Sequence, residues 1–498
     1  MNESDGAVRR LDRTDDAKGL KSSLRTSCFL RPFPSSRSRW ARPRREMFAL
    51  IRAVGLTLLL AGLPVASFAE QRPPVVKQSR EGGALEYVAD AAGNRLPDFS
   101  YAGYGGGGVP LPLAPARVAV EPGSDDATAR LQAAIDYVSS LAPDANGLRG
   151  AVQLGAGRYV VSGRLHIAAS GVVLRGAGDG ADEKSTVLFA AGTDRRALIA
   201  IQGKADRVFT TSPVAVADAY VPVGAMTVRV KKSAGFHVRD AVVVSRPATK
   251  DWLHALGMDV APGRQQFAWK PAAMTLTWDR TILAIDGDRV TLDAPLTTAL
   301  DARFGGATIA TYQWAGRLTK VGVEHLRCES AVDPSNPLDE QHAWEAVSLD
   351  AVEDAWVAGL TGIHFAGSLI NVGPGCRRVT VQDCTSLAPV SELGGYRRHT
   401  FHTAGQLTLF LRCRSEDGRN DFTTGYLAGG PNVFLACVAE RSHGFSGSVG
   451  SWASGILFDN ITLDGGTLAL DNRETWNQGV GWAAANSMLW QCSAPVVI

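Results

Sequence analysis

Short runs of alternating apolar and polar residues, separated by turns, dominate the second half of this chain. Each run is a strand of about four residues with a small polar or thiol residue at its end. The copies lie at 323–328, 379–384, 409–413, 433–437, 456–460 and 488–492, and they end on Cys328, Cys384, Cys413, Cys437, Asn460 and Cys492. Adjacent markers are 23 to 32 residues apart, except for one interval of 56, which fits two turns with an unmarked turn near Val357–Phe365. One apolar strand per 20–30 residues indicates a solenoid.

In a solenoid, equivalent positions of successive turns stack directly above one another. The markers are therefore expected to form a ladder inside the molecule, because cysteine is among the most buried residue types. Metal binding is the alternative, but no CxxC or similar spacing accompanies these cysteines. Cys413 and Cys437 fall on adjacent turns, and spacing alone leaves a disulfide between them open.

The part of the chain before these repeats fits the same architecture. Residues 151–176 are short β-rich runs broken by Gly and Ser, as expected for the first turns. Residues 125–140 carry apolar side chains at helical spacing, with Asp125 or Asp126 as the expected N-cap. This helix would cover the open first turn of the solenoid.

Residues 203–318 interrupt the repeat and predict a small β module. The runs GFHVRDAVVVSRP and TILAIDGDRVTLDAPL are strand-like, and Asp286-Gly287 is a hairpin turn signal. The Trp-rich segment between them, Trp252 to Trp278, offers two interpretations. Its rings either stack on sugars or form the core of the module.

Three segments resemble known β-helix proteins. The runs LPDFSYAGYGGGGVPLP, DDATARLQAAID and GAVQLGAGRYVVSGRLHI resemble the opening of the pectate-lyase superfamily, in its rhamnogalacturonase/epimerase-like branch. The resemblance covers most of residues 95–498 and implies an all-β fold. This fold is a single-stranded right-handed parallel β-helix with an N-terminal capping helix and an inserted small β module. Because this fold carries many activities, it implies little about the reaction.

Composition and the N-terminus predict export. The chain has 51 Lys and Arg against 49 Asp and Glu, but without residues 1–69 the balance becomes 38 against 43. A nucleic-acid partner is therefore not expected. Residues 47–69 have the charge, apolar run and small residues of a signal peptide, so the protein is expected in the periplasm or secreted, without stable membrane insertion after cleavage. Residues 1–46 are expected to be a disordered leader or a misassigned start. We expect 70–100 to be an extension and 101–498 the β-helix, with the module at about 203–318.

Polar residues that follow the markers are expected to share one lateral face. Counting from each marker brings Asp417, Asp421 and Asp464 together with Arg419, Arg441 and His443. The loop after Cys384 adds Arg397, Arg398, His399 and His402. Salt bridges between stacked loops are the structural alternative.

These groups suit two reactions on an acidic polysaccharide or oligosaccharide. In β-elimination, His443 or His402 is the base and arginines bind the uronate carboxylate. A Ca²⁺ ion held by Asp417, Asp421 and Asp464 would replace the arginines in that role. In hydrolysis, Asp417 and Asp421 would act as the carboxylate pair.

The predicted catalytic residues are His443, Arg419, Asp421, Asp417 and His402. Arg398, Arg441, Trp452, His342 and Glu345 are predicted to bind substrate, the last two with Trp344 in a second cleft.

Two further resemblances bear on the activity. SHGFSGSVG at 442–450 resembles the HG segment of polygalacturonases, a family that pairs it with Asp-Asp and a downstream Arg-x-Lys. Here Asn420-Asp421 takes the place of Asp-Asp, and only Asn472-Arg473 follows. Later segments resemble uncharacterised secreted bacterial β-helix proteins, a group with His where this chain has Asn420, Val449 and Gly450.

Three functions follow as hypotheses. We expect an exported polysaccharide lyase acting on uronate-containing polymers, with a polygalacturonase-like hydrolase as the first alternative. A non-catalytic glycan-binding protein is the second alternative. The chain ends on Pro495-Val496-Val497-Ile498 without a polar cap. We therefore expect either a truncated gene, or an end of the solenoid that packs on a loop or associates with a partner chain.

Overall fold

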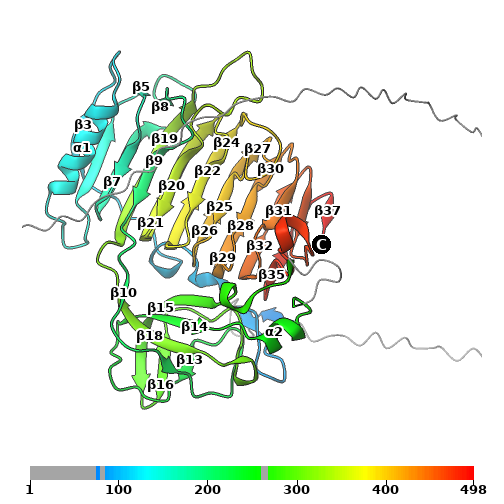
Figure 1. The fold of residues 1–498 in the computed structure, drawn as a ribbon. Coiled ribbons are helices and arrows are strands. Elements are labelled where there is room, and N and C mark those ends of the chain that lie inside the picture. The colour runs from blue at the N-terminus through cyan, green and yellow to red at the C-terminus, as the bar shows by residue number, and fades with distance from the viewer. Residues whose placement is uncertain (1–74, 79–84, 260–266) are drawn as a thin grey trace, which may run out of the picture. The chain divides into compact units, whose positions relative to one another are not determined.

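Stacked parallel strands form the body of the molecule in the computed structural model, which describes residues 75–78, 85–259 and 267–498. The predicted leader at 1–46 and signal peptide at 47–69 lie outside the described residues. The fold is a right-handed parallel β-helix with a capping helix and an inserted β module, so the predicted fold class is confirmed (Figure 1).

One face of the solenoid is a sheet of nine parallel strands within the described part of the chain, which we call the nine-stranded sheet. Its strands are β6 (Leu165–Ile167), β9 (Ala197–Gln202), β20 (Glu345–Asp350), β22 (Ser368–Val372), β25 (Phe401–Thr403), β28 (Phe422–Thr424), β31 (Phe445–Ser448), β34 (Thr467–Ala469) and β37 (Val496–Val497).

The remaining faces are formed by a second set of parallel strands that close the coil. These are β3 (Ala116–Val120), β4 (Gly150–Leu154), β5 (Gly157–Val161), β7 (Val172–Gly178), β8 (Thr186–Ala190), β19 (Leu318–Ser330), β21 (Val352–Ile363), β23 (Arg377–Gln382), β24 (Thr385–Leu387), β26 (Leu409–Leu411), β27 (Arg414–Glu416), β29 (Gly429–Leu435), β30 (Val438–Glu440), β32 (Ala453–Asp459), β33 (Thr462–Leu463), β35 (Ala484–Ala485) and β36 (Met488–Trp490).

The capping helix α1 (Thr128–Ser140) lies across the first turn, at the left end of the coil in Figure 1. It buries Leu131, Ala134, Ile135 and Val138, which are the apolar positions at helical spacing in the sequence. The predicted aspartate N-cap is wrong, because Ala127 occupies that position. Asp126 instead accepts hydrogen bonds from the backbone N and the Oγ1 of Thr128, at 3.0 and 2.6 Å.

The inserted module consists of antiparallel strands and begins after β9. Its elements are β10 (Val208–Phe209), β11 (Val214–Ala215), β12 (Tyr220–Val221), β13 (Thr227–Arg229), β14 (Ala241–Arg246), α2 (Lys250–Ala255), β15 (Leu276–Asp286), β16 (Arg289–Leu292), β17 (Leu300–Asp301) and β18 (Thr308–Gln313). β15 and β16 form the hairpin that Asp286-Gly287 predicts. β19 then pairs with β7 and β8, so the coil resumes where the insertion left it.

A few short elements complete the described chain. They are the antiparallel pair β1 (Val76–Gln78) and β2 (Leu85–Tyr87), helix α3 (Trp476–Gly479), and single 3-10 turns at Phe99–Tyr101, Tyr104–Gly106, Pro271–Ala273 and Ala302–Phe304. Within the described residues, no helix has the length and apolar character needed to cross a membrane.

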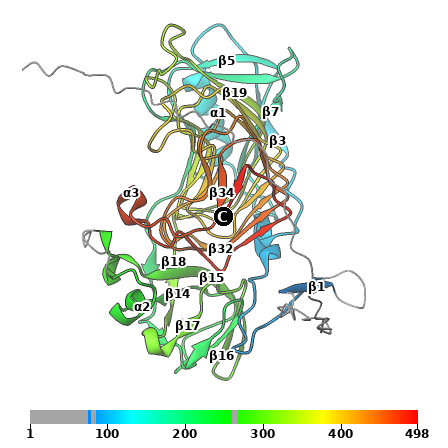
Figure 2. The same ribbon diagram turned by 90° about the vertical axis from the view of Figure 1, so that its right-hand side faces the viewer.

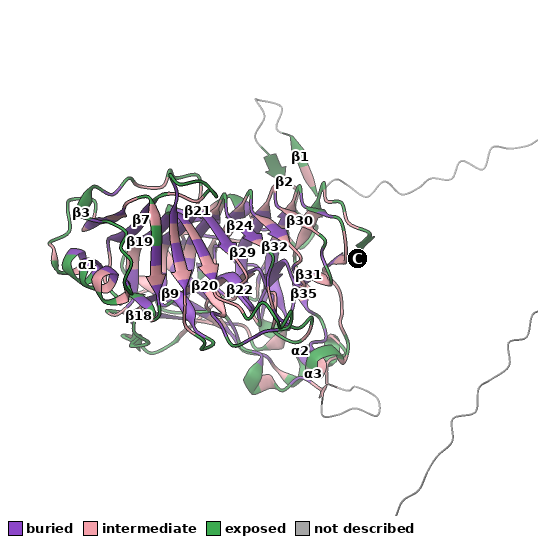
Figure 3. Ribbon diagram, turned by 90° about the horizontal axis from the view of Figure 1, so that it is seen from above, coloured by how far each residue is buried: buried purple, intermediate pink, exposed green. Residues whose placement is uncertain are grey.

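Stacked side chains fill the interior of the coil. Many residues of the strands that enclose it are buried (Figure 3). The rings of Phe410, Phe434 and Phe458 lie parallel, with centroids 4.7 and 4.9 Å apart on successive turns. This spacing equals the distance between neighbouring strands, so the turns are in register. The tryptophans of the module are also core residues, because Trp252, Trp269 and Trp278 are all buried.

The predicted cysteine ladder is confirmed in part. Cys384, Cys413 and Cys437 occupy equivalent buried positions on adjacent turns, and all are free thiols. Cys328 lies two residues away from this line, since it pairs with Gly362. Asn460 is exposed, and its neighbour Ile461 takes the interior position.

The error at Asn460 has a backbone cause. Each turn bends through one residue with a left-handed backbone immediately before the interior position. Asn460 has φ 55° and occupies this corner, as Arg412 and Ala436 do with φ 52° and 53°. Asparagine tolerates this conformation better than most residues.

A buried network of charges joins the module to the coil. Asp279 of β15 accepts hydrogen bonds from Tyr312 Oη at 2.6 Å and from Arg317 Nη1 at 2.7 Å. Arg377 Nη1 lies 3.2 Å from Asp279 Oδ1, and Arg377 Nη2 lies 2.8 Å from Glu353 Oε1. Burial alone would raise the pKa of Asp279, but Arg377 and Arg317 outweigh it and lower that pKa to about 2.

We expect Asp279→Asn to destabilise the protein by about 3–5 kcal/mol, because it leaves the buried Arg317 and Arg377 with the carboxylate of Glu353 alone. Unfolding in urea, followed by tryptophan fluorescence, measures the loss. Asp288→Asn is the matched control, since Asp288 forms an exposed ion pair with Arg229 on the same module and should leave the midpoint unchanged. An unchanged midpoint for Asp279→Asn would contradict the inference that Asp279 helps to join the module to the coil.

The same network predicts acid sensitivity. The pKa of Asp279 is lower in the folded than in the unfolded chain, so its stabilisation is complete above about pH 4 and is lost as the pH falls towards 2. In Asp279→Asn this part of the pH dependence should be absent, which midpoints measured from pH 5 to pH 2 would reveal.

Candidate functional site

The predicted loop cluster exists, but its groups are paired with one another. Arg441 donates to Asp417 through Nε at 3.0 Å and through Nη2 at 2.9 Å, and it also contacts Glu416. His443 Nε2 lies 3.5 Å from Asp417 Oδ1. The hydrogen bonds from Arg441 lower the pKa of Asp417. The predicted stacking is therefore present, and it takes the form of an exposed ion-pair cluster of Asp417, Arg441 and His443 on adjacent turns.

Two further predicted arginines hold loops in place. Arg398 donates to the carbonyl oxygen of Ser391 at 2.8 Å and to that of Asp417 at 3.1 Å. Arg419 Nη1 donates to the carbonyl oxygen of Gly395 at 3.0 Å. Both guanidiniums thus tie the loop between β24 and β25 to the next turn.

Asp421 does not lie on the surface, so the prediction that it contacts substrate is wrong. Its carboxyl group is fully buried and accepts hydrogen bonds from Ser415 Oγ at 2.6 Å and from Ser442 Oγ. Burial raises its pKa. The chain has already rejoined the nine-stranded sheet here, because Phe401 N donates to Asp421 O and β28 starts at the next residue.

The proposed calcium set is not assembled. Asp421 is enclosed inside the coil, whereas Asp464 is exposed and accepts from the backbone N of Ser442 at 3.3 Å. Across the described part of the chain, no three His, Cys, Asp or Glu side chains are grouped to hold a metal ion. Asp417 is occupied by Arg441.

His342 and Trp452 were also assigned wrongly to substrate binding. His342 is fully buried, with Nδ1 2.9 Å from Ser330 Oγ and Nε2 3.0 Å from Val390 O. Trp452 packs edge-on against Trp252 and Trp269, with ring centroids 5.0 and 6.1 Å apart. Both side chains are core residues. Their polar or aromatic character in the sequence does not distinguish a core position from a surface position.

His402 and Glu345, by contrast, line two adjoining clefts over the nine-stranded sheet. Paired residues of neighbouring strands point to the same side, so the register defines one row across the sheet. This row comprises His166, Ala200, Ser348, Asn371, His402, Thr423, Gly447 and Ala469. Ala200, Ser348 and Asn371 line one cleft, His402 lines the other, and Pro374 belongs to both.

We call the first the arginine cleft; it has a volume of about 440 Å³. Its lining includes Arg164, Arg195, Trp344, Glu345 and Asn371. The Arg195 guanidinium lies 5.2 Å from the Trp344 ring centroid. Glu345 Oε1 accepts a hydrogen bond from Asn371 Nδ2 at 2.7 Å, and burial raises the pKa of Glu345.

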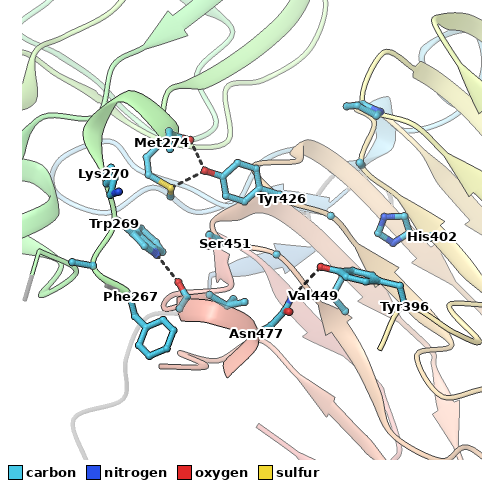
Figure 4. A pocket seen from close by; sticks show the side chains of 18 residues that line it. Phe267, Trp269, Lys270, Met274, Tyr396, His402, Tyr426, Val449, Ser451 and Asn477 are labelled. Atoms are coloured by element: carbon cyan, nitrogen blue, oxygen red, sulfur yellow. Dashed lines mark hydrogen bonds between the residues drawn. The ribbon is translucent and has the colours of Figure 1, made fainter. Parts of the chain in front are cut away.

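The second, which we call the aromatic pocket, has a volume of about 650 Å³ and lies between the module and the coil (Figure 4). Four rings line it, from Phe267, Trp269, Tyr396 and Tyr426. The segment that carries Phe267 and Trp269 belongs to the module and also supplies Lys270 and Met274, whereas Tyr396 and Tyr426 come from the coil.

Hydrogen bonds hold these walls together. Trp269 Nε1 donates to Gly479 O at 3.1 Å, and Asn477 Nδ2 donates to Tyr396 Oη at 3.1 Å. Helix α3 thereby contacts both the module and the loop that carries Tyr396, at the side of the coil seen in Figure 2.

His402 lies at the base of the aromatic pocket. Its Nδ1 is 2.9 Å from Thr423 Oγ1, and the ring lies 5.9 Å from that of His399. Burial lowers the pKa of His402 to about 4, and burial together with the neighbouring His402 lowers the pKa of His399 to about 3. Both imidazoles are therefore neutral at pH 7.

Sequence reasoning identified His402, Glu345 and Trp344 but missed Asn371, Tyr396, Tyr426 and Lys270. The repeat markers lie on the other faces of the coil, so they carry no signal for the nine-stranded sheet. Lys270 belongs to the module, which the turn periodicity does not describe. A row of small polar residues across β20, β22, β25 and β28 was the signal that could have located this face.

Comparisons with known proteins give structural likeness only. No protein-family model matches this chain, and no curated protein matches it significantly. The tailspike protein gp49 of Pseudomonas phage LKA1 is 14% identical with a TM-score of 0.39, over 74% of this chain and 56% of that one. A double mutant of the E. coli bacteriophage HK620 tailspike is 12% identical with a TM-score of 0.38, over 85% of this chain and 61% of that one.

A protein described as a glycoside hydrolase is 9% identical with a TM-score of 0.27, over 77% of this chain and 97% of that one. For the two tailspike proteins, by contrast, the match with this chain spans less than two thirds of their length. At these identities no site residue is transferable.

The buried histidine predicts a pH dependence of stability. Because the pKa of His402 is lower in the folded than in the unfolded chain, the unfolded state binds an additional proton between pH 6.5 and about 4. Stability is therefore expected to fall as the pH drops through this range. His402→Gln should flatten the slope. Equal slopes in the wild type and His402→Gln, from thermal midpoints, would contradict the burial of this imidazole.

Proposed function

We propose that the protein binds an acidic polysaccharide along the two clefts over the nine-stranded sheet and cleaves it by β-elimination. The observation that carries the proposal is a neutral imidazole, His402, at the base of a pocket lined by aromatic rings. Export of the protein, predicted from residues 47–69, belongs to this proposal.

The lining suits a sugar chain with negative charges. Aromatic faces stack on the apolar faces of sugar rings, and Tyr396 is 66% exposed, which leaves its ring available for such contact. Lys270 in the aromatic pocket and Arg164 in the arginine cleft supply positive charge for carboxylates, whereas Arg195 is already paired with Glu340. The adjoining clefts would accommodate consecutive residues of one polymer.

In the proposed reaction His402 acts as the base. It removes the C5 proton of a uronate, and Lys270 stabilises the negative charge that develops on the carboxylate. The C4–O bond then breaks, and the departing oxygen takes up a proton from the protonated His402 or from water, which leaves a C4–C5 double bond on one product and a new hydroxyl chain end on the other. His402 is neutral at pH 7 and so needs no prior loss of a proton, while its lowered pKa also makes it a weaker base than an exposed imidazole.

Hydrolysis finds less support because a suitable pair of carboxylates is lacking among the clefts' described residues. Glu345 and Asp350 both line the arginine cleft but lie five residues apart on β20. At ~3.3 Å per residue their Cα atoms are roughly 16 Å apart. Glycosidases hold their two carboxyl groups within about 5–9.5 Å. Asp421, the other predicted member of a pair, is buried.

The proposal is tested by incubating the protein with pectate, alginate and glucuronan and following the absorbance of unsaturated uronates. We expect this absorbance to rise with at least one polymer. New reducing ends without the absorbance would indicate a hydrolase and contradict β-elimination. Binding of a polymer without turnover would leave a glycan-binding protein.

Variants separate binding from chemistry. His402→Ala should lose turnover by about two to four orders of magnitude, as expected for removal of a general base, while polymer binding persists. Tyr396→Phe should retain binding, whereas Tyr396→Ala should weaken it by about 1 kcal/mol, roughly fivefold. His443→Ala is the matched control and should retain full turnover, because His443 lies outside both clefts. Loss of turnover only in His443→Ala would place the chemistry in the loop cluster instead.

A further inference from the structure

A third cavity lies on the inserted module, apart from both clefts, and contains a buried arginine. Its volume is about 410 Å³, and its lining includes Tyr220, Arg246, Trp252, Thr298 and Asn486. None of these residues lines the arginine cleft or the aromatic pocket.

Arg246, at the end of β14, is only 2% exposed. Its Nε donates to Ala299 O at 3.0 Å, and its guanidinium carbon lies 4.3 Å from the Trp252 ring centroid. Its Nη1, however, is buried without a hydrogen-bond partner among the described residues. The planar guanidinium of Arg246 thus uses only some of its donors, and such a group is suited to donate hydrogen bonds to two oxygens of a ligand.

Other arginines buried at the module boundary also leave donors without hydrogen-bond partners, namely Arg317 Nε and Arg377 Nε and Nη1, but these two side chains have carboxylates beside them. Arg317 and Arg377 each lie within 4 Å of carboxylates of Asp279 and Glu353. Arg280 donates to backbone carbonyls, among them Gly430 O at 2.7 Å. Arg246 has no carboxylate within ion-pair distance in the described part of the chain, so its charge lacks the close compensation that Arg317 and Arg377 have.

Asp301, which also lines the cavity, does not fill this role. Its carboxylate is held by Arg303, with Nε at 3.1 Å from Oδ1 and Nη2 at 2.6 Å from Oδ2. Burial lowers the pKa of Arg246 to about 10, and the more distant Asp301 opposes this only in part. The guanidinium therefore stays protonated at pH 7.

We infer that this cavity binds a small molecule bearing a carboxylate, about the size of a monosaccharide, with its carboxylate oxygens on the Arg246 guanidinium. Hydroxyl and amide groups of Thr298 and Asn486 and the ring of Tyr220 surround the remaining space. Such a site would let the module bind an acidic sugar unit independently of the clefts on the coil.

Calorimetric titration of the full chain with galacturonate, galactose and phosphate tests this inference. Galacturonate and galactose differ in carrying a carboxylate or a hydroxymethyl group, so we expect binding of galacturonate and none of galactose. Equal binding of both sugars, or no binding of galacturonate, would overturn the inference. Binding of phosphate as tight as that of galacturonate would overturn the preference for a carboxylate.

Substitution at the arginine locates the site. Arg246→Met keeps the length of the side chain beside Trp252 and removes the charge, so it should lower galacturonate affinity at least tenfold. Arg229→Met, on an exposed strand of the same module, is the control and should bind as the wild type does. His402→Ala should also bind as the wild type does, and its loss of binding would assign the sugar to the aromatic pocket.

A stability measurement distinguishes a ligand site from a structural arginine. Because the charge of Arg246 is incompletely paired, Arg246→Met without ligand should have an unchanged or higher thermal midpoint. A clearly lower midpoint together with unaltered galacturonate binding would show that Arg246 serves the fold only and would overturn the inference.

Discussion

The docking of the module on the coil depends on a buried cluster of charges. Asp279 belongs to the module, Glu353 and Arg377 belong to the coil, and separating the two would break the buried contact between Arg377 and Asp279. Buried ion pairs add little net stability compared with apolar packing, but separating their partners is costly. The network therefore specifies where the module sits, and with it the wall of the aromatic pocket that carries Phe267 to Met274.

A second constraint is the register of the turns. The parallel rings of Phe410, Phe434 and Phe458 require that successive turns align without slipping by one residue. The same alignment places Asn371, His402 and Thr423 in one row on the nine-stranded sheet. Packing inside the coil thus determines which polar side chains meet on its outside.

The loop cluster and the pocket are parts of one arrangement. Arg398 and Arg419 hold the loop between β24 and β25 through its carbonyl oxygens, and that loop carries Tyr396 to the edge of the aromatic pocket. Arg398, predicted to bind substrate, and Arg419, predicted to be catalytic, thereby position a residue that lines the pocket. Interior polar groups such as His342 and Asp421 play a comparable part by hydrogen bonding inside the turns.

The sequence by itself determined the solenoid, its capping helix and the presence of an inserted module, because periodic apolar positions and turn residues act locally. The same counting placed Asp417, Arg441 and His443 on neighbouring turns, since register carries residues about 24 positions apart to adjacent places. The counting failed at Asp421 and Asn460, because a shift of one or two residues along the chain moves a side chain between the corner, the loop and the interior of a turn. Only the tertiary structure brought Lys270 and Trp269 of the module into the same pocket as His402. This arrangement depends on how the module docks on the coil, which no period in the sequence describes.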